Sequence, residues 1–440
     1  MKYHIEPVDH LHGEIKIPGD KSISHRSVML GSIAIGESCI DDILESEDVK
    51  ATINAFKSLG VKINGPKNGR IIIKGNGIQG FTPPNLSIDC GNSGTSIRLL
   101  TGILSAQNFS SILIGDRSLM KRPMQRIADP LTKMNAKISL GINGCPPIKI
   151  EPTNSNRNLI GINYELPIAS AQVKSAIILA ALYAKNRTII TEPSNSRDHT
   201  ERMLSSLGAD IKCKSNKIII NPLNKNKLKT LEISIPGDFS SAAFWIVAAT
   251  IARKGEVLLK NVGINPTRIA ALGILEKMGA KLNLINKKII SGEPVADIKI
   301  KSAKLQGITI PAKLVSIAID EFPILFIAAS AAKGITKLTN AQELRNKESD
   351  RLASMSAGLK TLGIKHKLMP DGIIIEGNGD NDWNGGEIDS FSDHRIAMSF
   401  AVAAIRARKS ICINNCQNVK TSYPNFVADA RELGLNVSCE

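Results

Sequence analysis

Ile17-Pro18-Gly19-Asp20-Lys21-Ser22 decides the fold, because the chain repeats this stretch as Ile235-Pro236-Gly237-Asp238-Phe239-Ser240. Proline fixes φ and glycine permits positive φ, so each copy predicts a turn that ends a strand. The Asp and Ser that follow are typical of a helix N-cap. Helical patterns then run over Ile23–Ile35 and Ala242–Ala252. The repetition predicts two equivalent junctions that join two halves of the chain.

The two copies differ in charge. The first carries Lys21, His25 and Arg26 in and near the first helical turn, whereas the second carries Phe239 and Phe244. A helix N-terminus offers unpaired N–H groups and a partial positive charge, so added cations predict an anion site at the first copy. The alternative is a solvated basic turn.

The composition indicates a soluble globular protein whose 440 residues suggest two domains. Hydrophobic residues make up 42% and charged residues 22%, which argues against disorder. The formal net charge is +16, but Lys and Asn are abundant throughout, so part of this charge reflects composition rather than a binding surface. Aromatic residues are only 4%, fewer than a nucleic-acid surface needs for base stacking. Small acidic substrates are the better inference.

The cysteine pattern and the apolar runs predict a cytoplasmic protein. Seven Cys are scattered without a Cys-x-x-Cys motif, which favours reduced thiols. The start, Met1–Lys16, lacks an apolar core of signal-peptide length, and no apolar run approaches a membrane span. His4, His10 and His12 lie near the N-terminus without a Cys or carboxylate cluster, so an exposed terminus is favoured over a metal site.

A short pattern recurs six times, at intervals of 71 to 84 residues. It consists of an apolar residue, then Gly (once Asn), a small or apolar residue, any residue and, except in the fifth copy, another apolar residue. Gly or Asn directly after an amphipathic helix predicts a left-handed cap, and the alternating tail predicts a strand. The six predicted helix-to-strand joints are Leu59–Ile63, Met134–Ile138, Leu207–Ile211, Met278–Leu282, Leu362–His366 and Leu433–Val437.

Three joints precede the second Pro-Gly-Asp copy and three follow it, which predicts two domains of three repeated α/β units each. Residues 21–236 are expected to form an inserted domain, and residues 1–20 together with 237–440 the domain that contains both termini. Short Ile-rich strands are expected at Arg70–Ile73, Lys217–Ile220 and Gly372–Ile375.

Polar clusters recur just before or within the first turn of predicted helices. In the first half they are Asp89–Arg98, Gly115–Met124, Ala169–Ser175 and Ser196–Glu201. The first is a Gly-rich turn that lets backbone approach a ligand closely. Lys121 and Arg122 in the second can equally be surface charges. The last is typical of a Ser-capped helix start, which makes His199 structural rather than catalytic.

The second half has matching clusters at Asp320–Pro323, Glu343–Arg351, Asp393–Arg395 and Lys420–Pro424. Lys347 and Arg351 have helical spacing, so they can share a face that is only a salt-bridged surface. Taken together, the clusters predict that helix N-termini from both domains meet at one cleft and bind two multiply charged anions, with domain closure excluding water.

These motifs resemble the 5-enolpyruvylshikimate-3-phosphate synthase family over essentially the whole chain. The matching motifs are Pro18–Ser22, Gly91–Thr95 with Arg98, Lys347–Arg351, Asp393–Arg395 and Lys420–Pro424. The resemblance implies an α/β fold: a two-domain inside-out α/β barrel, three βαβαββ-type units per domain, with the active site in the interdomain cleft. Four further motifs resemble the second, glyphosate-tolerant class: Gly19–Ser22, Ser170–Lys174, Arg197–Glu201 and Asn265–Arg268.

The resemblance also implies the reaction, which is transfer of the enolpyruvyl group of phosphoenolpyruvate to the 5-hydroxyl of shikimate 3-phosphate with release of phosphate. The inserted domain is implied to bind shikimate 3-phosphate and the other domain phosphoenolpyruvate. Residues implied around shikimate 3-phosphate are Lys21, Ser22, Arg26, Ser170, Ala171, Gln172, Arg197, Asp320 and Lys347. Residues implied around phosphoenolpyruvate are Lys21, Asn92, Gly94, Arg122, Gln172, Arg351, Arg395 and Lys420. Ala171 stands where the first class has Ser, and Arg197 can replace that phosphate contact.

Asp320 and Glu348 are the candidate carboxylates for proton transfer, and Lys21, His394 and Lys420 are candidates to stabilise charge or donate protons. The resemblance implies no metal and no cofactor. The expected partners are the two small-molecule substrates, with no nucleic acid and no membrane, and the expected state is a monomer.

Two alternative functions can be distinguished from this interpretation. The sibling enolpyruvyl transferase that acts on a UDP-amino sugar carries a reactive Cys in the loop matching Asp116–Arg122. Here that loop has Leu119 and Met120, and Lys21 is followed by Ser rather than Asn. A basic RNA-binding module is the rival from another class, since a related α/β unit occurs in an RNA-phosphate cyclase. It predicts steep affinity for polyanions rather than saturation by two small anions.

Overall fold

The computed structural model describes residues 1–152, 159–223 and 228–440. The chain forms two compact units. The terminal unit comprises Met1–Pro18, Pro236–Ile289 and Pro294–Glu440, and the inserted unit comprises Gly19–Ile235 with Ile290–Glu293. The Pro-Gly-Asp copies therefore lie where the chain passes from one unit to the other. The short segment Ile290–Glu293, a hairpin turn, belongs to the inserted unit, although the predicted domain bounds place it in the other.

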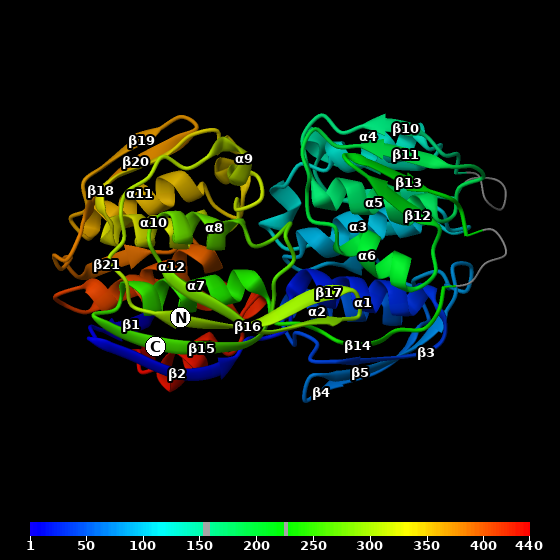
Figure 1. Cartoon of the computed structure of the whole chain (residues 1–440). Coiled ribbons are helices and arrows are strands. Elements are labelled where there is room, and N and C mark those ends of the chain that lie inside the picture. The colour runs from blue at the N-terminus through cyan, green and yellow to red at the C-terminus, as the bar shows by residue number, and fades with distance from the viewer. Residues whose placement is uncertain (153–158, 224–227) are drawn as a thin grey trace. The chain divides into compact units, whose positions relative to one another are not determined.

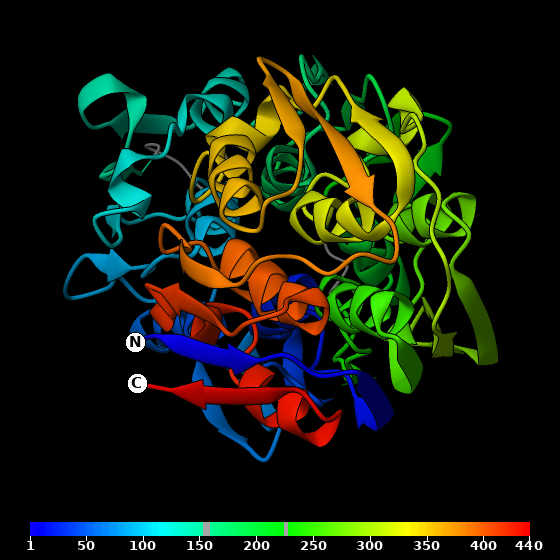
Figure 2. The same ribbon diagram turned by 90° about the vertical axis from the view of Figure 1, so that its left-hand side faces the viewer.

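Both chain ends lie in one sheet of the terminal unit. Strand β1 (Tyr3–Glu6) pairs antiparallel with β22 (Ile411–Asn414) on one side and with β23 (Asn436–Cys439) on the other. Strand β21 (Gly386–Asp389) completes the sheet by pairing parallel with β22. Figure 2 shows the N and C ends on neighbouring strands of this sheet.

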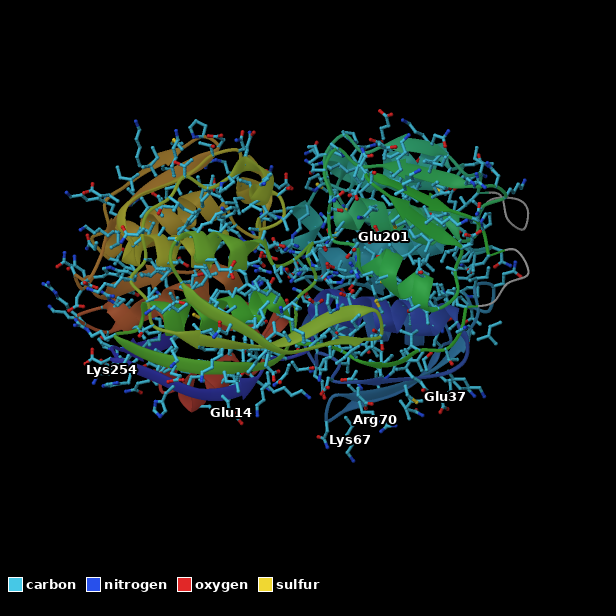
Figure 3. The ribbon with its side chains drawn as sticks, in the orientation of Figure 1. Glu14, Glu37, Lys67, Arg70, Glu201 and Lys254 are labelled. Carbon is cyan, nitrogen blue, oxygen red and sulfur yellow. The ribbon has the colours of Figure 1, made fainter. Side chains whose placement is uncertain are left out.

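Two further sheets complete the strands of the terminal unit. One has the order β16-β17-β15-β2 and the other the order β18-β20-β19. Their bounds are β2 His10–Lys16, β15 Lys254–Gly263, β16 Lys281–Ile290, β17 Glu293–Lys301, β18 Lys333–Leu338, β19 His366–Met369 and β20 Gly372–Asn378. Glu14 on β2 and Lys254 on β15, both labelled in Figure 3, are exposed, so one face of their sheet is in solvent.

The core helices of the terminal unit are apolar all round. Every residue of α7 (Phe239–Ile251) and of α10 (Phe322–Ala331) is buried, as expected for helices without a polar face. Both pack against α12 (His394–Ala403). The other helical segments are α8 Ala270–Lys277, α9 Ala312–Val315, η3 Gln342–Asn346, α11 Arg351–Thr361, η4 Ala404–Arg406, η5 Cys416–Thr421 and α13 Phe426–Glu432.

The described residues of the inserted unit form three four-stranded sheets, ordered β14-β3-β5-β4, β6-β7-β9-β8 and β10-β11-β13-β12. Strands of the first and third of these sheets are labelled in Figure 1. Their bounds are β3 Ile35–Asp41, β4 Lys62–Lys67, β5 Arg70–Asn76, β6 Ile88–Asp89, β7 Ser111–Ile114, β8 Lys137–Leu140, β9 Ile148–Glu151, β10 Asn163–Glu165, β11 Thr188–Thr191, β12 Ile211–Lys214, β13 Lys217–Ile220 and β14 Glu232–Ser234. The predicted Ile-rich strands are confirmed as parts of β5, β13 and β20.

The helices of the inserted unit include three whose N-termini carry predicted site residues: α1 (Lys21–Ile33), α3 (Gly94–Leu104) and α5 (Ala171–Ala181). Helices α3 and α5 approach closely at Gly102, where a Cβ would lie 2.3 Å from the Ala176 carbonyl oxygen. The remaining segments are α2 Glu47–Ser58, η1 Leu119–Lys121, α4 Gln125–Lys133, η2 Ile142–Gly144 and α6 His199–Ser206.

Helix α1 begins and ends two residues before the predicted Ile23–Ile35. It begins at Lys21 because the Asp20 carboxylate accepts a hydrogen bond from the Ile23 amide and caps the helix there. It ends because Ala34 is extended, which places Ile35 in β3. Lys21 and Ser22 therefore lie in the first turn.

All six predicted helix-to-strand joints are confirmed. The residue at the cap position has positive φ in every case: Gly60 83°, Asn135 75°, Gly208 86°, Gly279 99°, Gly363 73° and Gly434 96°. Each follows a helix (α2, α4, α6, α8, α11 or α13) and is followed within a few residues by a strand (β4, β8, β12, β16, β19 or β23). Glycine adopts this conformation without a steric penalty, which explains the recurring signal.

The described residues form six sheets, and five of them share one topology. In each, an edge pair is parallel and the two following pairs are antiparallel. In the sixth sheet, two isolated parallel bridges, Gln306 to Lys333 and Thr309 to Lys337, stand in place of the parallel edge strand. The result is a mixed α/β fold with six small sheets consistent with repeated units. Among the residues described, none of the helices is long and apolar enough to cross a membrane.

Candidate functional site

Two cationic side chains at the N-terminus of α1, Lys21 and Arg26, are held in place by neighbouring polar groups. Lys21 Nζ lies 3.1 Å from Asp48 Oδ2. Arg26 is only 4% exposed; its Nε donates to Thr200 Oγ1 at 2.6 Å and its Nη2 to Ser175 Oγ at 2.8 Å. Because the helix dipole also places partial positive charge at the N-terminus of α1, this end of the helix is suited to bind an anion.

A chain of hydroxyl groups links α1 to the neighbouring helices of the inserted unit. His25 Nδ1 lies 2.7 Å from Thr52 Oγ1, which lies 2.6 Å from Ser96 Oγ on α3. Burial, together with the positive charges of Lys21 and Arg26, holds the pKa of His25 well below its ordinary value. His25 is therefore a neutral ring at physiological pH, and it fixes helices rather than moving a proton.

The Gly-rich turn before α3 gathers four of the predicted residues. Ser93 caps the helix through the Ser96 amide, so Gly94 is its first residue. Asn92 Oδ1 accepts from Arg122 Nη2 at 2.8 Å. Gln172 lies beside the same turn, because its Oε1 accepts from Arg98 Nη1 at 2.7 Å and its Nε2 donates to Thr95 Oγ1 at 3.1 Å.

Helix α5 begins at Ala171, and Ser170 caps it by accepting from the Val173 amide. Lys174, only 1% exposed, forms ion pairs with Glu192 at 2.8 Å and with Glu201 at 2.7 Å. Glu201, labelled in Figure 3, lies in the first turn of α6. Burial raises the pKa of Glu201 although Lys174 lowers it.

The predicted Ser cap of α6 is wrong. The helix begins at His199 with Asp198 at the N-cap position, and Ser196 Oγ instead donates to Glu192 Oε1. His199 is structural as expected, because it is buried and pairs with Glu293 at 2.8 Å. Arg197 lies in the loop just before this helix and is partly buried.

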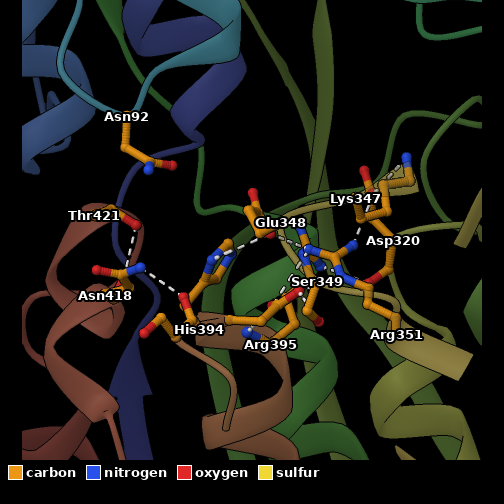
Figure 4. Close-up of polar contacts among 12 residues, drawn as sticks. Asn92, Asp320, Lys347, Glu348, Ser349, Arg351, His394, Arg395, Asn418 and Thr421 are labelled. Atoms are coloured by element: carbon orange, nitrogen blue, oxygen red, sulfur yellow. Dashed lines mark hydrogen bonds and ion pairs between the residues drawn. The ribbon is translucent and has the colours of Figure 1, made fainter. Parts of the chain in front are cut away.

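In the terminal unit, Arg351 is the centre of a network of carboxylates (Figure 4). Arg351 is only 2% exposed; its Nε donates to Asp393 Oδ2 at 2.8 Å, its Nη1 lies 3.3 Å from Asp320 Oδ1 and its Nη2 donates to Glu348. Burial acts to lower the pKa of Arg351, but the three carboxylates raise it well above its ordinary value. The guanidinium is therefore always charged.

Lys347 and Arg351 do not share a helical face, contrary to the simple spacing argument. Helix α11 begins at Arg351, and Lys347 is extended, with ψ of −151°. Their side chains nevertheless converge, because Lys347 Nζ lies 3.4 Å from the same Asp320 oxygen that Arg351 contacts.

Helix α12 brings two further predicted residues to this network. It begins at His394, whose Nδ1 lies 3.7 Å from Glu348 Oε2, and Asp393 caps it through the Arg395 amide. Arg395 Nη1 donates to the Asp320 carbonyl oxygen at 2.8 Å. Asp320, Lys347, Glu348, Arg351, His394 and Arg395 are thus brought together.

Glu348, Asp393 and His394 offer ligand atoms within 4.8 Å of one another, a spacing that could hold a metal ion. Arg351 already donates hydrogen bonds to both of these carboxylates. A divalent cation there would compete with a buried guanidinium, so the arrangement fits an ion-pair network better than a metal centre.

Lys420 lies in η5 (Cys416–Thr421) with an exposed side chain. Hydrogen bonds of Asn418 to the Ser392 carbonyl and of Thr421 to the Asn418 carbonyl fix this segment (Figure 4). Behind it, Tyr423 is buried and donates to Asp429 Oδ2 at 2.6 Å.

The predicted residues thus fall into two sets. The inserted unit holds Lys21, Ser22, Arg26, Asn92, Gly94, Arg122, Ser170, Ala171, Gln172 and Arg197, and the terminal unit holds Asp320, Lys347, Glu348, Arg351, His394, Arg395 and Lys420. Sequence reasoning missed Asp48, Thr200 and Asp393 as partners of these cations. Asp393 belongs to the motif Asp393–Arg395, but its partner Arg351 lies 42 positions away in the sequence.

A family model described as EPSP synthase (3-phosphoshikimate 1-carboxyvinyltransferase) matches residues 5–429. The chain belongs to the EPSP synthase family. The family and the enzyme activity predicted from the sequence are confirmed.

Relatives in the EPSP synthase family match along nearly their whole length. The 3-phosphoshikimate 1-carboxyvinyltransferase of Alkalilimnicola ehrlichii is 49% identical over 435 residues, covering 99% of this chain and 96% of that protein. That of Ruthia magnifica is 51% identical, with 99% of each chain covered. The structure of EPSP synthase from Acinetobacter baumannii matches with a TM-score of 0.89 and 49% identity, covering all of both chains.

A more distant structure is similar in fold alone. The enolpyruvyl transferase NikO from Streptomyces tendae has a TM-score of 0.82 at 16% identity, covering 99% of this chain and 98% of that chain. The mixed α/β architecture is therefore that of the EPSP synthases and of enolpyruvyl transferases more broadly.

Proposed function

We propose that this member of the EPSP synthase family transfers the enolpyruvyl group of phosphoenolpyruvate to the 5-hydroxyl of shikimate 3-phosphate, by addition and then elimination of phosphate. The product leads to chorismate and the aromatic amino acids. The observation that carries the proposal is the family match over residues 5–429, within which both sets of site residues lie.

Most residues proposed to bind shikimate 3-phosphate belong to the inserted unit: Lys21, Ser22, Arg26, Ser170, Ala171, Gln172 and Arg197. Asp320 and Lys347 come from the terminal unit. The substrate's phosphate needs fixed cations and amide donors, which the N-termini of α1 and α5 supply through Lys21, Arg26 and the cap residue Ser170. Arg197, in the loop before α6, is proposed to provide the phosphate contact at Ala171, which has no hydroxyl group.

The residues proposed to bind phosphoenolpyruvate are Arg351, Arg395 and Lys420 of the terminal unit, together with Lys21, Asn92, Gly94, Arg122 and Gln172 of the inserted unit. Arg351 and Arg395 supply charge for the carboxylate and phosphate of this substrate. Because the reaction joins the two substrates, the proposal requires both sets to act on one pair of bound molecules during turnover.

Asp320 and Glu348 are the proposed proton-transfer groups. Addition needs one proton taken from the 5-hydroxyl and one placed on the methylene carbon. Asp320 is proposed to accept the first; Lys347 and Arg351, at 3.4 and 3.3 Å, favour the ionised carboxylate that can take up a proton. Glu348 is proposed to deliver the second; its ion pair with Arg351 favours the carboxylate form, so it must first take up a proton, and His394 Nδ1 lies 3.7 Å from it. Lys420 and Lys21 are proposed to stabilise charge on the phosphate group that leaves.

Five finer assignments belong to the same proposal. The three sheets of each unit are proposed to form the inside-out barrel of the family. The motifs Ser170–Lys174 and Arg197–Glu201 support membership of the glyphosate-tolerant second class. A cytoplasmic location and a monomeric state complete it, with no metal or cofactor required.

The test is release of inorganic phosphate from purified protein. We expect turnover only when both substrates are present, with control reactions omitting each substrate in turn. A UDP-amino sugar should not replace shikimate 3-phosphate. Phosphate release with the UDP-amino sugar and none with shikimate 3-phosphate would instead assign the sibling reaction.

A further inference from the structure

The second Pro-Gly-Asp junction carries a cation that the sequence comparison of the two copies missed. Asp238 caps α7 by accepting from the Ser240 amide at 2.8 Å, and the same oxygen accepts from Arg268 Nη2 at 2.8 Å. Arg268 is 3% exposed and comes from the turn between β15 and α8. The second copy itself contains no cation, as its sequence shows, and Arg268 supplies one from 30 positions away.

From Arg268, a buried path leads to Arg395. Arg268 Nη2 donates to Ser240 Oγ at 2.8 Å, and Ser240 Oγ donates to Glu321 Oε1 at 2.5 Å. That same Glu321 oxygen lies 3.6 Å from Arg395 Nη1. Charges along the path alternate in sign, from Asp238 to Arg268 and from Glu321 to Arg395.

Glu321 is the N-cap residue of α10, a helix that is apolar apart from Ser330. It is 2% exposed and directly follows Asp320 at the start of the helix. Burying a carboxylate costs free energy unless partners compensate it, and well-packed apolar residues often replace a buried ion pair without loss of stability. A buried acid here is therefore better explained by what it orients than by stability.

What Glu321 orients is the Arg395 guanidinium. Arg395 Nη1 is held by the Asp320 carbonyl at 2.8 Å and by the Glu321 carboxylate, and both acceptors lie at the start of α10. A guanidinium binds carboxylate or phosphate best when its plane is fixed, because two parallel hydrogen bonds need a defined direction.

We propose that Glu321, Ser240 and Arg268 are positioning residues that set the orientation of Arg395 for the carboxylate or phosphate of phosphoenolpyruvate. The inference rests on the proposed function, in which Arg395 contacts this substrate. None of the three touches a substrate in this scheme; each acts through Arg395.

Ser240→Ala is the central test, and Ser241→Ala is its matched control. Ser241 is the next residue of α7, is buried at 5% exposure and lies outside the path. We expect Ser240→Ala to raise KM for phosphoenolpyruvate about tenfold, the loss of one hydrogen bond to a charged group, with KM for shikimate 3-phosphate changing less than about twofold. Ser241→Ala should change neither KM. Ser240→Thr keeps the hydroxyl group, so its KM for phosphoenolpyruvate should stay close to that of the unaltered protein.

A double-variant cycle separates positioning from general damage. In an Arg395→Lys background the guanidinium is gone, so adding Ser240→Ala should raise KM for phosphoenolpyruvate no further. Glu321→Gln should behave as Ser240→Ala does in both backgrounds.

The proposal is overturned if both KM values rise together, if the two substitutions are additive, or if only the melting temperature falls. Should Ser240→Ala not fold, Glu321→Gln carries the same comparison. Failure of the proposed function is distinct, because the unaltered protein would then release no phosphate from the two substrates.

Discussion

Replacing Gly94 by Ala is expected to weaken the binding of glyphosate more than the binding of phosphoenolpyruvate. A Cβ at this position would lie 2.6 Å from Arg98 Nη1 and 3.4 Å from Arg122 Nη1. The first distance is roughly 1 Å shorter than a favourable contact, so the Arg98 side chain must move. Arg98 Nη1 also donates to Gln172 at 2.7 Å, so the movement disturbs a second residue of the predicted site.

The magnitude follows from this geometry. Overpacking commonly costs about 1–3 kcal/mol, which corresponds to roughly 5- to 150-fold in affinity. Because the clash is with the far end of a flexible side chain, we expect the lower part of this range, about 5- to 30-fold for glyphosate. Phosphoenolpyruvate is the shorter molecule, and its KM should rise less.

The assay is the ratio of the glyphosate inhibition constant to the KM of phosphoenolpyruvate, measured by phosphate release. The unaltered protein should show competitive but weak inhibition, and the ratio should rise in Gly94→Ala. Gly273→Ala is the matched control, because this helical glycine has nothing within 4 Å of an added Cβ. A folded Gly94→Ala protein with an unchanged ratio would refute the placement of Gly94 beside the inhibitor.

Three further predictions concern carboxylates. Glu348→Gln should keep substrate affinity but lower turnover by about 10²- to 10⁴-fold in the phosphate-release assay, and near-normal turnover would remove Glu348 from the chemistry. Lys174→Met should lower the free energy of unfolding by about 3–5 kcal/mol in urea titrations, because it leaves Glu192 and Glu201 buried without their cation; a change below about 1 kcal/mol would contradict the pairing. Burial raises the pKa of Asp429 from 3.8 to about 6, so its contribution to stability is present at pH values below its ordinary pKa and is lost as pH rises through 6. Asp429→Asn should therefore gain stability relative to the unaltered protein between pH 4 and 7, and parallel pH profiles of the two proteins would disprove the shift.

The repeat and the caps were predictable from sequence because their causes are local. Gly60 and the five residues equivalent to it must adopt positive φ directly after a helix, and glycine or asparagine is selected for that reason alone. The cap of α1 at Asp20 depends only on the next three residues. Such signals need no knowledge of what packs around them.

The partners of the charged residues were not predictable, because packing between distant segments creates them. Lys21 meets Asp48 across 27 positions, and Arg26 meets Thr200 across 174. The helical spacing of Lys347 and Arg351 gave a wrong prediction, because the backbone at Lys347 is extended rather than helical. The two side chains lie close together only because both contact Asp320.

The sheet that contains both chain ends also sets an order of assembly during synthesis. Strand β1 is made first, yet both of its neighbours, β22 and β23, lie near the end of the chain. At about 5–20 residues per second, roughly 20–90 s pass on the ribosome before β1 can pair on both edges. Residues 19–235 of the inserted unit are complete by the middle of this interval. An unpaired strand edge invites association with other chains, so the charged or ionisable side chains of His4 and Glu6 on β1, and of Glu14 and Lys16 on β2, help to keep the waiting segment soluble.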